Sequence, residues 1–139
     1  MFGTIKDRVS PRRVVHAHCD IPCGIYDPHE AQIAAQTVET MVTKIRALPD
    51  STSEASRNSF VRMVEVKELH AEKVKREVLI IWGDYFKPEH LEKFPELHDL
   101  TWKTVKAASA CKQSIDPEKA AELRSKVDEF ARIFWETKK

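Results

Sequence analysis

Residues 116–136, DPEKAAELRSKVDEFARIFWE, decide the fold class of this chain of 139 residues. Asp116 suits a helix N-cap, Pro117 suits the first helical position, and Glu118 follows in the first turn. Apolar residues then recur in steps of three and four: Ala120, Leu123, Val127, Phe130 and Phe134. This spacing is typical of the seam of a helical bundle, so it predicts a helix with one side buried against neighbouring helices.

A similar start signal and spacing occur earlier in the chain. Asp27, Pro28 and Glu30 open a first apolar stripe. Residues 49–53, PDSTS, interrupt this stripe and can cap the next helix. A second and longer stripe follows, and Gly83 is the candidate stop for its helix. The first stripe consists of Ala34, Val38, Met41, Val42, Ile45 and Leu48. The second consists of Phe60, Met63, Val66, His70, Val74, Val78 and Ile81.

Two more prolines mark helix starts after the second stripe. Pro88 predicts a short helical piece near 88–94, and Pro95 leads into a helix over 95–112. The stripe of that helix consists of Leu97, Leu100 or Thr101, Val105, Ala108 and Cys111. Four helices with short connections predict an all-α fold, an antiparallel up-down four-helix bundle over residues 27–139.

Composition bounds the class of protein. With 42% hydrophobic and 32% charged residues, the chain is too apolar to be disordered, and three glycines are too few for a β-sandwich. No apolar run reaches about 18 residues, so no membrane-spanning segment is expected. The formal net charge of +1 gives no reason to expect nucleic acid as a partner.

The first 17 residues, MFGTIKDRVSPRRVVHA, differ from the rest of the chain. They carry a net charge of +3, which leaves −2 on the following 122 residues. They lack the apolar stretch of about 7–15 residues that a secretory signal needs. The segment is therefore either a frayed basic N-terminus or a propeptide that is removed. The missing signal, together with reduced thiols, favours a cytoplasmic protein.

The three cysteines divide into a close pair and a remote residue. An odd number argues against a disulfide scaffold. Cys111 lies on an apolar stripe and is interpreted as a core thiol. Cys19 and Cys23 lie in residues 18–26, HCDIPCGIY, which precede the first helix and form a candidate metal-binding hook. A Cys-x₃-Cys pair alone is a weak signal, because free cysteines are often small buried apolar residues.

Cutting the chain between Ala17 and His18 would complete a ligand set. The new α-amine, the amide nitrogen and thiolate of Cys19 and the thiolate of Cys23 give four donors in a plane, and the His18 imidazole can reach an axial position. Such a plane of two nitrogens and two sulfurs suits nickel or copper rather than tetrahedral zinc. A copper- or zinc-carrying binding protein and a plain helical interaction module with an incidental cysteine pair are the alternatives.

Four motifs resemble the nickel superoxide dismutase family: HCDIPCGIYDP at 18–28, WGDYFKP at 82–88, FPELH at 94–98 and IFWETKK at 133–139. The resemblance spans residues 18–139. It implies a four-helix subunit with a nickel-binding hook at 18–26, one nickel ion per subunit and assembly into a homohexamer. It also implies conversion of superoxide to oxygen and hydrogen peroxide by cycling nickel between +2 and +3, after a dedicated protease removes the propeptide 1–17.

The resemblance assigns roles to individual residues. His18, Cys19 and Cys23 would be the nickel ligands. Asp20 and Tyr26 in the hook and Tyr85 in the second motif would frame the substrate pocket, where the phenols order water and limit access. Positive charge near the pocket would come from Lys87, since local positive potential raises the encounter rate of a small anion.

Two positions depart from the better-known members of that family. Those members carry a glutamate on the first helix and an arginine on the second, which hold the axial imidazole. The aligned residues here are Ala34 and His70. His70 lies in line with Val66 and Val74, so it is expected to face inward, either as a core residue or as a hydrogen-bond partner of His18.

Overall fold

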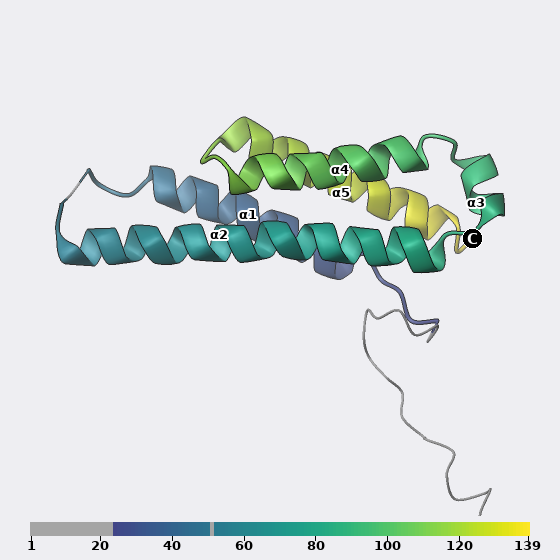
Figure 1. The fold of residues 1–139 in the computed structure, drawn as a ribbon, viewed down its shortest axis with the longest axis horizontal. Coiled ribbons are helices and arrows are strands. Elements are labelled where there is room, and N and C mark those ends of the chain that lie inside the picture. Colours follow the sequence, from purple (N-terminus) through teal and green to yellow (C-terminus); the bar gives the residue numbers. More distant parts are fainter. Residues whose placement is uncertain (1–23, 51) are drawn as a thin grey trace, which may run out of the picture.

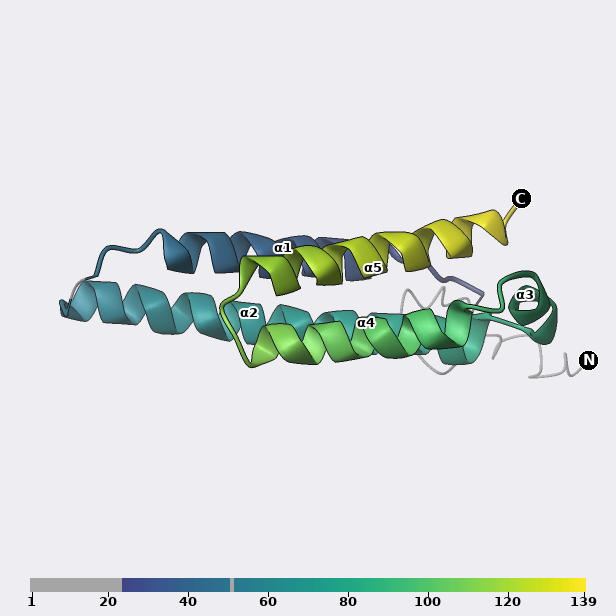
Figure 2. The ribbon, with the colours of Figure 1, turned by 90° about the horizontal axis from the view of Figure 1, so that it is seen from above.

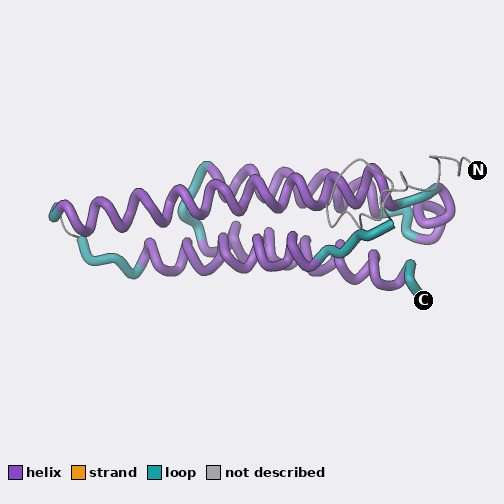
Figure 3. Tube along the Cα trace, turned by 90° about the horizontal axis from the view of Figure 1, so that it is seen from below, coloured by secondary structure: helices purple, strands orange, loops and turns teal. Residues whose placement is uncertain are grey.

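Four long helices pack side by side in the computed structural model, which describes residues 24–50 and 52–139 (Figure 1). They are α1 (His29–Arg46), α2 (Glu54–Ile80), α4 (Leu97–Lys112) and α5 (Pro117–Glu136). Helix α1 contacts α2 and α5, and α4 contacts the same two helices, so the four form a closed ring. Successive long helices run in opposite directions (Figure 2). The predicted all-α four-helix bundle is confirmed, and the described residues contain no strand (Figure 3).

The side chains that the sequence indicates as helix starts make the expected hydrogen bonds. The Asp116 carboxylate accepts the Glu118 N–H at 2.9 Å, and the Ser53 hydroxyl accepts the Ser56 N–H at 3.2 Å. Before α1, the Asp27 carboxylate accepts the His29 N–H at 2.8 Å. Each bond satisfies a backbone donor that lacks a partner in the first helical turn. These local signals therefore set where the helices begin.

The apolar stripe of α5 forms one wall of the core, as its spacing predicts. All five of its residues are fully buried. Helix α1 contributes Ala31, Ala34, Ala35 and Val38, also fully buried. Three alanines on one face keep α1 thin there, so neighbouring helices can approach closely and leave few voids.

The second predicted stripe is only half correct. Val74, Val78 and Ile81 are buried, but Phe60 is 42% exposed and Met63 is only partly covered. Helix α2 has 27 residues and α4 has 16, a difference of about 16 Å at 1.5 Å per residue. The first turns of α2 therefore extend past α4 and α5, and of the long helices only α1 remains beside Phe60 and Met63 (Figure 1).

The prediction that Gly83 ends the second helix is wrong. After Ile80 the chain widens into a π-helical turn, η2 (Ile81–Tyr85), which the Phe86 N–H closes by donating to the Ile81 carbonyl at 3.3 Å. The left-handed backbone expected of a C-terminal glycine cap is found at Gly24 (φ 72°) and at no other described residue. The extra residue in a π turn shifts the side chains that follow it, including Tyr85.

Beyond η2 the chain turns across one end of the bundle. The short helix α3 (Pro88–Lys93) lies there, at the end where the C-terminus of the chain also lies (Figure 2). The predicted piece near 88–94 is confirmed as α3, and the helix predicted over 95–112 is confirmed as α4. No helix among the described residues is long and apolar enough to cross a membrane.

A buried lysine ties α2 to the end of α4. Lys67 is 1% exposed, and its ammonium donates to the Cys111 carbonyl, to the Lys112 carbonyl at 2.9 Å and to Glu68 at 3.0 Å. Carbonyls in the last turn of a helix lack helical donors and carry the negative end of the helix dipole. Lys67 therefore acts as the C-terminal cap of α4 from a neighbouring helix, a role that apolar periodicity does not reveal.

Replacing Lys67 with methionine tests this cap. K67M keeps most of the side-chain volume but loses the charge-assisted hydrogen bonds, which lowers stability. The variant also avoids the cost of dehydrating the ammonium, which partly offsets that loss. We expect the free energy of unfolding to fall by about 2 kcal/mol. Urea unfolding followed by circular dichroism measures the change. The control is K103M, because Lys103 is exposed and pairs only with Asp99 on the surface, and its midpoint should match the parent. A K67M protein as stable as the parent would show that the dehydration of the ammonium offsets the whole contribution of the cap.

Candidate metal and substrate site

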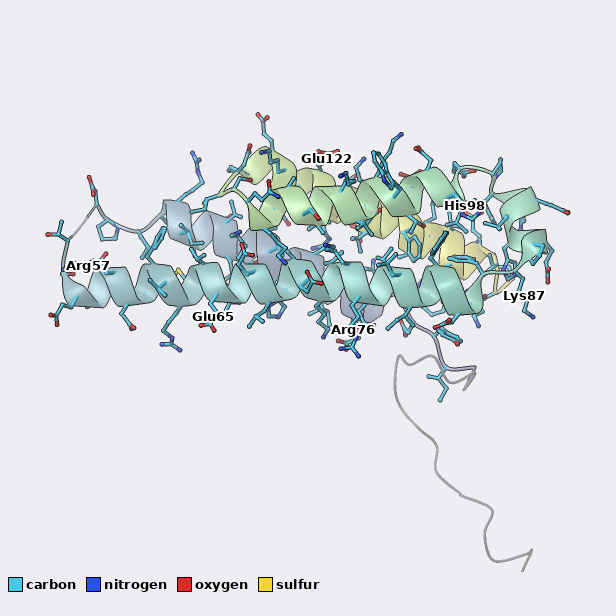
Figure 4. All side chains as sticks on the ribbon, in the orientation of Figure 1. Arg57, Glu65, Arg76, Lys87, His98 and Glu122 are labelled. Carbon is cyan, nitrogen blue, oxygen red and sulfur yellow. The ribbon has the colours of Figure 1, made fainter. Side chains whose placement is uncertain are left out.

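A hollow of about 510 Å³ opens at the end of the bundle beside α3. Its lining residues come from the N-terminal segment, from η2 and α3, and from the C-terminus: Gly24, Tyr26, Asp84, Tyr85, Lys87, His90, Thr137 and Lys138. Figure 4 shows Lys87 at this end of the molecule. Residues 18–23, the predicted ligand segment, directly precede Gly24 in the sequence, so the hollow is where the chain leads from the hook into the bundle.

A second hollow of similar size lies at the opposite end. It measures about 530 Å³ and is lined by the α1–α2 connection, with Phe60 and Arg57 in its wall. Figure 4 places Arg57 at the far end of α2 from Lys87. This hollow contains none of the residues that the sequence singles out for chemistry, so we place the candidate site at the first one.

The structure brings Tyr26 and Tyr85 together although they are far apart in sequence. Their ring centroids are 5.7 Å apart, and both rings are partly covered. Tyr85 also packs on Phe134 at 4.6 Å, and its hydroxyl lies 2.7 Å from the Thr137 hydroxyl. The predicted pair thus forms one aromatic wall, held by the last turn of α5. Thr137 is a contact that the sequence analysis missed.

His90 forms the other side of this wall. Its ring stacks on Tyr85 with centroids 5.6 Å apart and planes at 17°. Its Nδ1 accepts the Lys87 N–H at 3.2 Å, so His90 also caps the start of α3. With Nδ1 accepting, the proton of the neutral imidazole is on Nε2. The sequence analysis missed its place in the hollow, because the stacking partner lies on η2.

The charged residues of the hollow are mixed in sign. Lys87 and Lys138 contribute two positive charges, and Asp84 contributes one negative charge. The Lys138 ammonium lies 4.6 Å from the Tyr85 ring centroid, a cation–π contact. Lys138 is exposed to solvent as well as lying over this ring. Its place in the motif 133–139 was the one signal that could have indicated a role.

The two positions that depart from better-known members lie on α1 and α2. Ala34 is fully buried in the core and His70 is partly covered. The Nδ1 of His70 lies 2.8 Å from the Val66 carbonyl. A carbonyl only accepts, so Nδ1 carries the hydrogen and Nε2 of the neutral ring is an acceptor. His70 is thus only partly inward-facing, and its ring is tied to its own helix.

The predicted metal ligands His18, Cys19 and Cys23, together with Asp20, lie outside the described residues. Within residues 24–50 and 52–139 no group of three or more His, Cys, Asp or Glu could hold a metal ion. The donor set of the hook itself fits nickel, because thiolates and a deprotonated amide are strong donors for a square-planar ion. The ligand assignment therefore rests on the hook sequence.

Comparison with known proteins identifies the family. The family model for nickel-containing superoxide dismutase matches residues 13–138. The chain is 42% identical over 130 residues to the nickel superoxide dismutases of Streptomyces coelicolor and Streptomyces seoulensis, and each match covers 94% of this chain and 95% of the relative. This chain belongs to the nickel-containing superoxide dismutase family. The resemblance seen in the four sequence motifs is thereby confirmed.

A solved structure of the family has the same fold. The native nickel superoxide dismutase structure at 1.30 Å superposes with a TM-score of 0.78 and 42% sequence identity. The match covers 88% of this chain and 100% of the solved one. The helical bundle of this nickel-containing superoxide dismutase family member is therefore that of a solved relative.

The third cysteine is separated from this site by its environment. Cys111 is 1% exposed in the core, and its thiol donates to the Lys119 carbonyl at 3.3 Å. Burial raises the pKa of the Cys111 thiol from its ordinary value of 9.0 to about 11. The thiolate is the form that binds metals and reacts, so Cys111 is poorly suited to either. The interpretation as a core thiol is confirmed.

The reactivity of Cys111 is a measurable consequence. In a C19S/C23S variant it is the one thiol left, and at pH 8 a shift of two pKa units implies about 100-fold less thiolate in the folded chain than in the unfolded one. We expect a thiol reagent to label the native protein at least about 100-fold more slowly than the same variant in urea. Because the folded state holds this proton more tightly, stability should fall as the pH rises from 9 towards 11. Equal labelling rates would contradict the burial.

Proposed function

We propose that this chain is the precursor of an enzyme that converts two superoxide ions and two protons into oxygen and hydrogen peroxide. Membership of the nickel-containing superoxide dismutase family supports the reaction. The observation that carries the proposal is the position of the hook: its donor residues immediately precede Gly24 and Tyr26, which line the hollow with Tyr85. When bound in the hook, nickel supplies a one-electron couple between +2 and +3.

We assign the nickel ligands to three residues of the hook. The α-amine and imidazole of His18, the amide nitrogen and thiolate of Cys19 and the thiolate of Cys23 would hold the ion. An amine ligand at His18 requires cleavage after Ala17, and so it gives the basic leader a physical purpose. While the leader is attached, the ligand set lacks one nitrogen donor.

The extent of the matches supports removal of the leader. The native solved structure is covered over its full length by 88% of this chain, which is the share that residues 18–139 represent. The curated relatives align over 94% of the chain, so their sequences extend into a counterpart of the leader. If a propeptide is removed, its counterpart should occur in the relatives' sequences and be missing from the solved chain. The extents of these matches agree with that expectation.

The residues around the hollow bind and orient the substrate. Lys87 and Lys138 give the hollow a positive potential, which attracts a small anion. The negative charge of Asp84 reduces the net charge of these three residues to +1. Tyr26 and Tyr85 form a wall that orders water and restricts access, and we assign Asp20 of the hook to the same pocket. None of these side chains needs to carry the electron.

The assembly and compartment of the enzyme are also proposals. We propose a homohexamer of processed chains, a cytoplasmic location and a dedicated processing protease, as the family resemblance implies. Three tryptophans with exposed faces, Trp82, Trp102 and Trp135, are suited to contacts between subunits, because aromatic side chains are enriched at protein interfaces.

Processing is the first test of the proposed function. Protein expressed with a functional protease should give a mass that begins at His18, with about one nickel per chain and superoxide turnover. A chain blocked at the cleavage site by A17P should keep the leader, because the cut bond then follows a proline, and it should lack turnover. Mass spectrometry, nickel analysis and a superoxide assay on the same samples decide the outcome. Full turnover by the uncleaved chain would refute the amine ligand.

The second test removes one sulfur donor at a time. C19S and C23S should each reduce superoxide turnover by at least about 100-fold, because each removes a thiolate that stabilises the higher oxidation state. Their helical circular dichroism should match the parent, since the bundle core is built from residues after the hook. The matched control is C111S, which removes a thiol that we place outside the site. If either hook variant unfolds the bundle, the hook is structural.

A further inference from the structure

The hydroxyl of Thr137 lies between two oxygen atoms at the end of α5. It is 2.6 Å from the Phe134 carbonyl oxygen and 2.7 Å from the Tyr85 hydroxyl oxygen. Thr137 is the C-terminal cap of α5, and it lines the hollow together with Tyr85. A single threonine thus links the end of the last helix to a tyrosine of the proposed pocket.

Counting hydrogens fixes the direction of both bonds. A carbonyl oxygen only accepts, and two oxygens 2.6 Å apart require a hydrogen between them, so the Thr137 hydroxyl donates to Phe134. A threonine hydroxyl has one hydrogen. Towards Tyr85 it can therefore only accept, and the phenol must donate its own hydrogen to Thr137.

The surroundings keep this arrangement in place. The Phe134 carbonyl belongs to the last turn of α5 and accepts two hydrogen bonds from Thr137, one from its N–H at 3.1 Å and one from its hydroxyl at 2.6 Å. The Tyr85 ring is confined by Phe134 at 4.6 Å, by the stacked His90 ring at 5.6 Å and by the Lys138 ammonium at 4.6 Å. These contacts hold the phenol oxygen of Tyr85 in place beside the Thr137 hydroxyl.

We propose that Thr137 is a positioning residue for the reaction. It accepts the hydrogen bond that the Tyr85 hydroxyl donates, so the phenol oxygen is left as a hydrogen-bond acceptor at the wall of the hollow. In this arrangement Tyr85 accepts a hydrogen bond from a water molecule and does not donate a hydrogen bond to the substrate. The two protons that peroxide formation requires then do not come from Tyr85. This inference rests on the proposed function, because it assigns Tyr85 to the substrate pocket.

The hydrogen-bond direction can be tested without activity. The chain has two tyrosines, so in a Y26F background the tyrosine Fermi doublet in the Raman spectrum reports on Tyr85 alone. The intensity ratio of this doublet separates a phenol that donates from one that accepts. We expect the donor pattern in Y26F and in Y26F/T137S, which keeps the hydroxyl, and a shift towards the acceptor pattern in Y26F/T137V. An unchanged ratio in Y26F/T137V overturns the proposal.

A double-mutant cycle tests whether Thr137 acts through Tyr85. In the processed, nickel-loaded enzyme, T137V should lower superoxide turnover by about three- to tenfold, the effect of losing one positioning hydrogen bond, and T137S should rescue it. In a Y85F background, T137V should have no further effect. An unchanged turnover in T137V, or an equal loss in the Y85F background, overturns the positioning role.

The two arms also separate this proposal from the proposed function. If the processed, nickel-loaded parent shows no superoxide turnover, the proposed function fails while the Raman arm still decides the direction of the bond. If the parent is active and the Y26F protein shows the acceptor pattern, the inference alone fails. Circular dichroism of T137V and T137S at matched temperature excludes a change in the bundle as the cause.

Discussion

The contact between the end of α2 and the end of α5 is the interaction on which the candidate site depends. Phe134 packs against Tyr85 at 4.6 Å and meets Phe86 edge-on at 6.5 Å, while Phe86 meets Phe130 edge-on at 5.6 Å. Phe130 and Phe134 are fully buried members of the α5 stripe. The same stripe that builds the bundle core therefore also fixes the aromatic wall of the hollow.

Features that depend on near neighbours in sequence were predictable. The caps at Asp27, Ser53 and Asp116 and the stripe of α5 rest on spacings of two to four residues, and each has its expected structure. Gly83 was not predictable in this way, because closure of the π turn depends on how Phe86 packs against α5. The exposed first turns of α2 depend on the length of another helix, which a local stripe does not contain.

The candidate site also contains some residues that were predictable from the sequence and others that were not. Tyr26, Tyr85 and Lys87 were found through family motifs, and the structure brings them to one hollow. Thr137 and Lys138 were not identified as site residues from the sequence, because their contact partner lies more than fifty residues away on η2. A hydroxyl or an ammonium near the end of a chain gives no sequence signal of its partner. These side chains gain a role only in the folded bundle, where η2 lies beside the last turn of α5.

The hydrogen bonds at the hollow leave it with a definite polarity. The Thr137 hydrogen is held by Phe134, the Lys87 N–H is held by His90, and the Tyr85 hydrogen is held by Thr137. The lining groups that keep a positive charge or a hydrogen for an anion are the ammonium groups of Lys87 and Lys138 and the Nε2–H of His90, because the phenol oxygen of Tyr85 serves as an acceptor. Attraction of the anion and ordering of water are thus assigned to different side chains. Because the phenol oxygen of Tyr85 accepts from water while the ammonium groups hold the anion, Tyr85 is not the proton donor to the substrate. Binding of the anion therefore does not require the packed aromatic residues of the wall to move.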